Sequence, residues 1–172
     1  DVRRVCELGK RNTIPVACDS TWGTPIFFDA HALGVTLSIH AATKYINGHS
    51  DVMMGLVTGT YEALAGTRSW CDRFGSHVSA DACWLTLRGL RTLSVRVKQH
   101  HQNALCVAEF LRSHPSIERV LFPALPGDPG HSSWLSQFTG APGPFTVELK
   151  SCSETAFESF INALVLFGLG TS

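Results

Sequence analysis

The sequence predicts an α/β protein in which a mainly parallel sheet precedes a smaller α+β domain. Short apolar segments alternate with loops and helical patterns in the first half of the chain, as is typical of parallel sheets. A long helical pattern then fills the middle of the chain. Two strand-like segments follow, separated by a stretch rich in proline and glycine. We therefore expect two units, residues 1–116 and residues 117–172.

The first unit should contain three strands and several helices. The chain begins with what reads as the end of a helix, up to about Asn12. The next elements are expected over residues 14–18 (strand), 35–39 (strand), 52–58 (strand) and 61–74 (helix). From Asp81 onward, apolar residues recur at spacings of three, four and seven, until Pro115 disfavours helix at the residue before it. A pattern this long is either two helices or one helix that bridges two domains.

The second unit should combine two strands with a helix. The strands are expected near residues 117–122 and 145–149, and the helix over residues 154–164. Ser151 and Glu154 have the spacing of a capping box for that helix. Apolar residues recur on one of its faces, which indicates a helix packed on a core.

Composition excludes several classes of protein. The 172 residues suffice for one domain and part of another. Lys+Arg and Asp+Glu are both 14 and no basic run is present, so we expect no nucleic-acid partner. No apolar stretch is long enough to span a bilayer, so we expect no membrane partner and a cytoplasmic location.

The cysteines and histidines predict neither disulfides nor a metal site. The six cysteines are scattered, and none forms a Cys-x-x-Cys pair. His100, His101 and Cys106 are close in sequence, but neighbouring helix positions point apart and no second cluster completes a ligand set. We expect the two histidines to be solvated helix surface.

Lys44 is the candidate catalytic residue, and Asp19 is its candidate cofactor-binding partner. Each follows a strand-like segment, and the carboxyl ends of parallel strands meet at one edge of a sheet, so the two side chains should converge. A partly buried lysine amine can condense with the aldehyde of pyridoxal phosphate (PLP). A carboxylate can keep the ring nitrogen of that cofactor protonated, which the cofactor needs in order to withdraw electrons.

Taken singly, a Thr-Lys pair or a strand-end aspartate is usually ordinary surface, but the joint pattern is more specific. Residues 41–50 read Ala-Ala-Thr-Lys-Tyr-Ile-Asn-Gly-His-Ser. This stretch resembles the lysine motif of the cysteine and methionine metabolism family of PLP-dependent enzymes, and Asp19-Ser20-Thr21 resembles the Asp-Asn-Thr motif that precedes it there. Residues 84–93, 126–131 and 138–140 also resemble family segments, so the resemblance covers nearly the whole chain.

The resemblance implies the fold of PLP-dependent transferases, that is, fold type I of the aspartate aminotransferase type. Residues 1–116 would form the C-terminal part of the large cofactor-binding domain with its bridging helix. Residues 117–172 would form an incomplete small domain.

The resemblance also implies a set of site residues. Lys44 would bind PLP and act as the catalytic base, and Asp19 would hold the ring nitrogen. Thr43 would donate its hydroxyl to the cofactor phosphate, and Thr21 would pack under the ring. Ser172 would belong to the region that binds the substrate carboxylate.

The activity follows from a finer resemblance. Trp22, the Ala41-Ala42 pair and residues 138–140 resemble the cystathionine β-lyase subgroup, which implies β-elimination of cystathionine to homocysteine, pyruvate and ammonia in methionine biosynthesis. A γ-lyase, γ-synthase or methionine γ-lyase activity stays open, as does a non-catalytic role. The family takes a stacking tyrosine and a carboxylate-binding arginine from outside the matched residues. We therefore expect an inactive fragment of a longer enzyme, which would form a homotetramer built of dimers and act on small sulfur amino acids.

Overall fold

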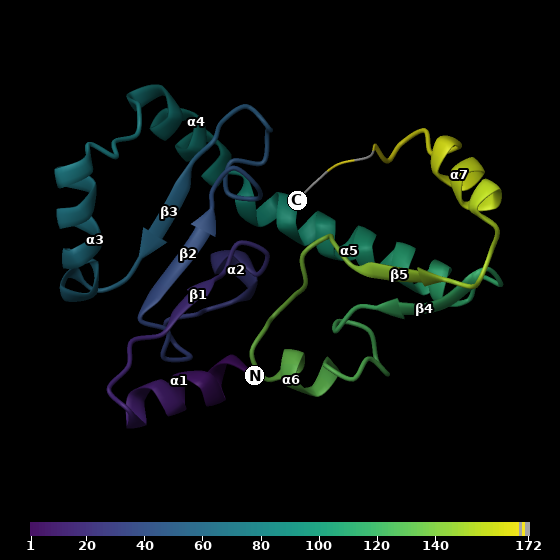
Figure 1. The fold of residues 1–172 in the computed structure, drawn as a ribbon, viewed down its shortest axis with the longest axis horizontal. Coiled ribbons are helices and arrows are strands. Elements are labelled where there is room, and N and C mark those ends of the chain that lie inside the picture. Colours follow the sequence, from purple (N-terminus) through teal and green to yellow (C-terminus); the bar gives the residue numbers. More distant parts are fainter. Residues whose placement is uncertain (169, 171–172) are drawn as a thin grey trace.

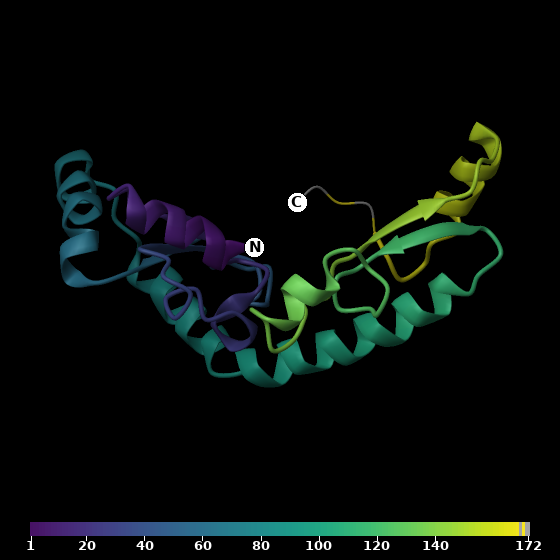
Figure 2. The ribbon, with the colours of Figure 1, turned by 90° about the horizontal axis from the view of Figure 1, so that it is seen from below.

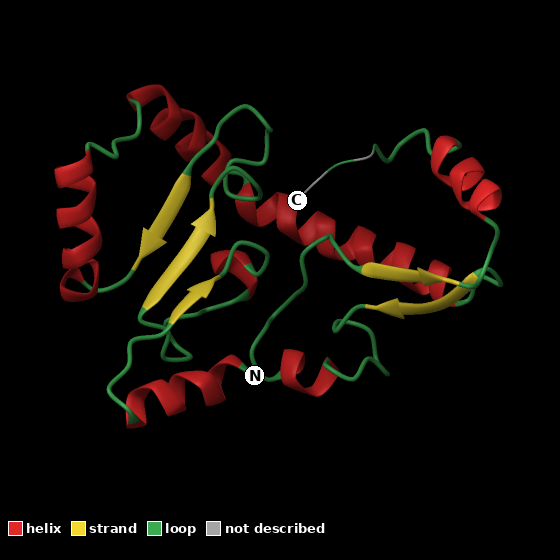
Figure 3. Ribbon diagram, in the orientation of Figure 1, coloured by secondary structure: helices red, strands yellow, loops and turns green. Residues whose placement is uncertain are grey.

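The chain forms two lobes joined by one long helix (Figure 1). The computed structural model describes residues 1–168 and residue 170. Its strands form two separate sheets, one of three strands in the first lobe and one of two strands in the second (Figure 3). Helix α5 (Leu93–Arg112) runs beneath both lobes, along the convex side of the molecule (Figure 2).

The first sheet has the strand order β1–β2–β3. Strand β1 (Ala17–Asp19) is parallel to β2 (Leu37–Ala41), as expected, with Asp19 beside Ile39. Strand β3 (Gly55–Thr58) is shorter than expected and antiparallel to β2. The direction differs because the chain returns from β2 without a helix, and antiparallel strands need no crossover helix between them.

The helices of the first lobe are α1 (Val2–Arg11), α2 (Thr24–Phe27), α3 (Tyr61–Phe74) and α4 (Ala80–Leu90). Helix α3 has the predicted bounds because both of its ends are capped. The Thr60 hydroxyl accepts a hydrogen bond from the Ala63 N–H, and Gly75 adopts the left-handed conformation that ends the helix. The long helical pattern after Asp81 is two helices, α4 and α5, and the second of them joins the lobes.

The second lobe pairs β4 (Ile117–Leu121) with β5 (Thr146–Leu149) and carries α6 (His131–Leu135) and α7 (Glu154–Asn162). Two predictions for α7 were wrong. Its N-cap is Ser153 and not Ser151, because the helix begins directly after Ser153, at Glu154, and the Ser153 hydroxyl accepts from the Ala156 N–H. None of its residues is buried, so its apolar face is not packed on a core within the described chain.

Helix α5 contributes to the cores of both lobes. Leu93 and Val97 pack against the loop after β2, in a cluster with Phe27, Ala42 and Ile46. Two turns further on, the same helix packs Ala104 and Ala108 against residues 122–125 of the second lobe. None of the described helices is both long enough and apolar enough to cross a membrane.

Candidate active site

The predicted catalytic lysine and the predicted cofactor-binding aspartate lie at one edge of the first sheet. Asp19 is the last residue of β1, and Lys44 follows the end of β2 by three residues. Both side chains line a pocket of about 720 Å³, whose other walls include Phe122 and Phe138 of the second lobe. The structure thus brings Asp19 and Lys44 to one pocket between the lobes.

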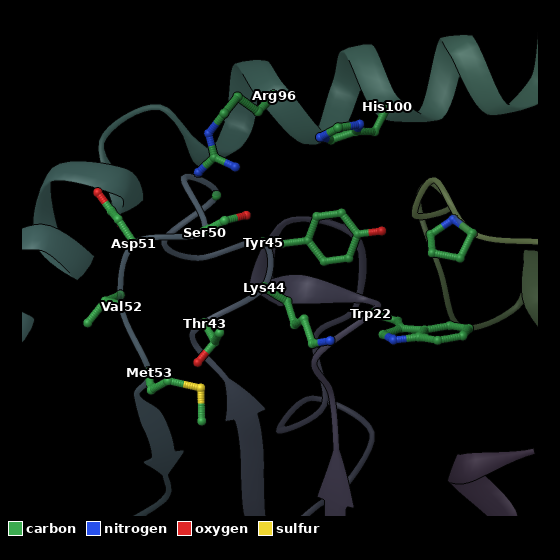
Figure 4. A pocket seen from close by; sticks show the side chains of 12 residues that line it. Trp22, Thr43, Lys44, Tyr45, Ser50, Asp51, Val52, Met53, Arg96 and His100 are labelled. Atoms are coloured by element: carbon green, nitrogen blue, oxygen red, sulfur yellow. The ribbon is translucent and has the colours of Figure 1, made fainter. Parts of the chain in front are cut away.

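Lys44 also faces a second pocket, of about 900 Å³. Figure 4 shows its side chain extending between the rings of Tyr45 and Trp22, with Thr43 beside it. The Lys44 side chain is exposed, although a partly buried amine was predicted from the sequence. The difference arises because the loop presents this side chain into an open pocket.

A hydrogen bond from Thr21 stabilises the ionised form of Asp19. The Thr21 N–H donates to Asp19 Oδ1 at 2.9 Å. Hydrogen bonding from Thr21 holds the pKa of Asp19 below its usual value, and the nearby His40 contributes in the same direction. Asp19 is therefore negatively charged at neutral pH.

The two predicted threonines brace the backbone around the pair. Thr21 is buried, and its hydroxyl accepts from the Ala41 N–H at 2.7 Å, which ties the end of β1 to the end of β2. The Thr43 hydroxyl accepts from the Met54 N–H at 2.9 Å and donates to the Met54 carbonyl at 3.4 Å. Ser172, the predicted substrate-binding residue, lies outside the described residues.

A buried polar network lies under this edge of the sheet. Ser38 Oγ is 2.8 Å from Ser20 Oγ and 3.1 Å from His40 Nε2, and all three residues are buried. Burial lowers the pKa of His40, against the opposing influence of Asp19. His40 is therefore neutral at neutral pH, and the network links the two strands that carry Asp19 and Lys44.

The expectation that His100 and His101 are both solvated was wrong for His101. His101 Nδ1 accepts from the Ala141 N–H at 3.2 Å, and its ring packs against Phe27. His101 follows Val97 by four residues, so it lies on the apolar face of α5, a signal that the sequence contained. His100 is exposed but packs edge-on against Tyr45 and lines the pocket of Lys44.

Tyr45 connects the lysine loop to the second lobe. Its hydroxyl accepts from the Gly143 N–H at 3.3 Å. Burial raises the pKa of Tyr45, so it is a neutral phenol at working pH. Arg96, a further pocket residue that the sequence analysis did not single out, contacts the same loop from α5.

The chemistry of these groups fits PLP. The chain places an amine, an ionised carboxylate and a hydroxyl at the carboxyl edge of a parallel strand pair, where α/β folds bind their ligands. Two crystal structures of cystathionine γ-synthase from Xanthomonas oryzae pv. oryzae have the same fold. They are complexes with aminoacrylate and cysteine and with cystathionine, and each matches all of this chain and 44% of its own with a TM-score of 0.95 at 36% identity. The predicted fold class, PLP-dependent fold type I, is confirmed.

The model of the Cys/Met metabolism PLP-dependent enzyme family matches residues 1–172, and the chain belongs to that family. This confirms the predicted family and its cofactor, PLP. The chain is 41% identical over 173 residues to a cystathionine β-lyase of Bordetella avium, covering all of this chain and 43% of the relative. It is also 41% identical over 164 residues to human cystathionine γ-lyase, covering 95% of this chain and 40% of the relative. The chain therefore spans about half or less of the length of the curated relatives that it matches.

Proposed function

We propose that residues 1–172 supply the lysine and the carboxylate of a PLP-dependent carbon–sulfur lyase that cleaves cystathionine by β-elimination to homocysteine, pyruvate and ammonia. The observation that carries the proposal is that Asp19 and Lys44 line one pocket at the carboxyl edge of β1 and β2. Bound PLP supplies an electron sink for the charge that develops on the substrate when its α-proton leaves.

Asp19 and Lys44 have separate tasks. The Asp19 carboxylate would hold a proton at the ring nitrogen of the cofactor, and its hydrogen bond from Thr21 keeps it ionised and oriented. The Nζ atom of Lys44 would hold the cofactor at its aldehyde carbon. Once the amino group of the substrate frees that atom, Lys44 would take the α-proton as a general base.

Thr43 and Thr21 would support the cofactor. The Thr43 hydroxyl lines the pocket of Lys44, and its bond to the Met54 carbonyl is long at 3.4 Å. It can redirect that proton to a phosphate oxygen and still accept from the Met54 N–H. Thr21 would pack under the ring, and its bond to the Ala41 N–H would keep the end of β1, which carries Asp19, in place.

The choice of β- over γ-elimination rests on Trp22 and the Ala41-Ala42 pair, which resemble the β-lyase subgroup. Overall identity supports neither, because the β-lyase and γ-lyase relatives are both 41% identical to the chain. The products separate the two, since β-cleavage of cystathionine releases pyruvate and γ-cleavage releases 2-oxobutyrate.

The activity is proposed for the whole protein, because the chain spans only about half or less of the length of its relatives. Residues 1–172 alone should be inactive, since a partial set of positioned groups does not catalyse appreciably. The alternative outside enzyme chemistry is that the polypeptide folds or associates but catalyses no reaction. The substrate role of Ser172, the tetramer, the cytoplasmic location and the division of the chain at residue 117 stay predictions.

The test uses the full-length protein, PLP and cystathionine, with separate assays for pyruvate and 2-oxobutyrate. We expect pyruvate, and we expect Lys44→Ala to abolish turnover while Lys98→Ala, a change at an exposed lysine of α5, leaves it unchanged. Release of 2-oxobutyrate alone would establish γ-cleavage instead. Turnover by the Lys44→Ala variant would refute the role of the lysine.

A further inference from the structure

We propose that Arg96, on α5, is the positioning residue that fixes the backbone of the lysine loop (residues 42–51) and thereby the position of Lys44. The inference rests on the proposed function, because the position of this loop matters for turnover only if Lys44 reacts. Figure 4 shows the Arg96 side chain reaching from α5 to the loop, on the far side of Tyr45 from the Lys44 side chain.

The guanidinium group of Arg96 joins three parts of the chain. Its Nη2 donates to the Ile46 carbonyl in the lysine loop at 3.3 Å and to the Gly89 carbonyl at the end of α4 at 2.9 Å. Its Nε donates to the Thr92 hydroxyl in the turn between α4 and α5 at 3.0 Å. Burial lowers the pKa of Arg96, but an arginine keeps its charge at any working pH, so these bonds are charge-assisted.

Gly48 brings the guanidinium close to the turn that contains Lys44. Its N–H donates to the Lys44 carbonyl at 2.7 Å, and its φ of 71° is in the left-handed region that favours glycine. A Cβ atom at this position would lie 2.1 Å from Arg96 Nη1. The guanidinium therefore lies directly against the residue that closes the Lys44 turn, and only glycine leaves room for it.

The rest of the loop is fixed from the same side. Asn47 is fully buried, and its Nδ2 donates to Asp51 Oδ1 at 2.8 Å, while Arg88 pairs with the other oxygen of Asp51 at 2.6 Å. A Cβ atom on Gly89 would lie 2.1 Å from the Asn47 carbonyl oxygen, so the loop backbone packs directly against the end of α4. Arg96 completes this contact, because it binds Gly89 and the loop at once.

The bonds of Arg96 explain why lysine should not replace it. Arginine presents its donors in a rigid planar fork, whereas lysine has one compact ammonium on a flexible stem. A lysine at position 96 cannot reach Ile46, Gly89 and Thr92 together. Loss of the fork should loosen the loop, and a displacement of about 1 Å at a reacting group can lower turnover by about a hundredfold.

The test compares Arg96→Ala, Arg96→Lys and the matched control Lys98→Ala, on the same helix, in the full-length holoenzyme. For Arg96→Ala we expect kcat to fall by about tenfold to a hundredfold while KM changes by less than about threefold. Added guanidinium ion should restore part of kcat in Arg96→Ala and none in Lys44→Ala. Lys98→Ala should match the parent protein.

The outcomes separate the inference from the proposed function. Turnover that survives Lys44→Ala would overturn the proposed function itself. An inactive Lys44→Ala combined with an unchanged kcat in Arg96→Ala would overturn only the role of Arg96, as would a loss of kcat that guanidinium does not restore. If Arg96→Ala fails to fold, Arg96→Lys decides by its kcat, because it keeps the stem and the charge, and a kcat equal to that of the parent would overturn the role.

Discussion

The two lobes bury different kinds of side chain. The buried polar residues of the described chain all belong to the first lobe and its helix α4, namely Ser20, Thr21, Thr24, Ser38, His40, Asn47 and Thr86. From α5 onward, the described residues with buried side chains are all apolar. A buried polar group destabilises a fold unless it is hydrogen-bonded, so the first lobe depends on hydrogen bonds between buried side chains in addition to packing. The side-chain hydrogen bonds of the second lobe, such as those that Asp128 accepts from the Phe122 and Gly130 N–H groups, come from residues that are not fully buried.

The two proposed cofactor-binding residues, Asp19 and Lys44, belong to the lobe with the buried polar residues. Hydrogen bonds fix direction as well as distance, and the bonds of Thr21, Ser38 and Asn47 hold the strand ends and the loop that carry Asp19 and Lys44. Apolar packing sets no comparable orientation. The second lobe contributes pocket walls such as Phe122 and Phe138 rather than charged groups.

The largest effect is expected from a substitution in the apolar core of the second lobe. Phe122 is 2% exposed and packs against Phe145 with ring centroids 5.2 Å apart. Replacing it by alanine in the 172-residue chain should lower the free energy of unfolding in urea by about 3–5 kcal/mol. The matched control is Phe157→Ala on α7, which is 46% exposed and should cost less than about 1 kcal/mol. Equal losses in the two variants would contradict the assignment of this core.

The next effect concerns charge at the site rather than stability. Asp19→Asn keeps the acceptor for the Thr21 N–H and removes the carboxylate charge. We expect kcat of the full-length protein to fall by about a hundredfold, equivalent to about 2.7 kcal/mol of transition-state stabilisation, with little change in unfolding. Asp29→Asn serves as the control, because Asp29 only accepts the Ala32 N–H in a turn. Unchanged kcat in Asp19→Asn would remove Asp19 from the site.

The smallest effect tests the polar network through pH. Burial lowers the pKa of His40 in the folded chain, so below its unfolded pKa of about 6.5 the unfolded chain binds the additional proton. The contribution of neutral His40 to the free energy of unfolding is complete above a pH of about 6.5 and is lost as the pH falls below that value. His40→Gln should therefore reduce the loss of stability between about pH 8 and about pH 5.5, measured by urea unfolding. An identical pH dependence in parent and variant would show that His40 is not buried in its neutral form.

Much of the fold could be predicted from local patterns. The bounds of α3 follow from Thr60 and Gly75, and the positions of Asp19 and Lys44 follow from strands that end at Asp19 and three residues before Lys44. The direction of β3 could not be predicted, because it depends on how the chain returns from the loop and not on the residues of the strand.

The positioning residues were less accessible to prediction. Arg96 acts through the approach of α5 to a loop 50 residues earlier, and nothing in its own sequence neighbourhood indicates that contact. The spacing of His101 from Val97 puts both residues on the same face of α5. A histidine is polar, however, so the sequence alone did not indicate that it contacts the chain on that face. Residue type and spacing therefore indicated the proposed cofactor-binding groups, while the residues that contact their loop could be found only in the tertiary structure.

The proposed bond between Lys44 and PLP can be located by reducing the full-length holoenzyme. Borohydride makes the bond between the cofactor and its lysine permanent, so that peptide mass spectrometry can locate it. We expect the mass of one reduced cofactor on the peptide that contains Lys44 and on none of the peptides that contain Lys10, Lys98 or Lys150. A cofactor mass on another lysine, with the Lys44 peptide unmodified, would contradict it.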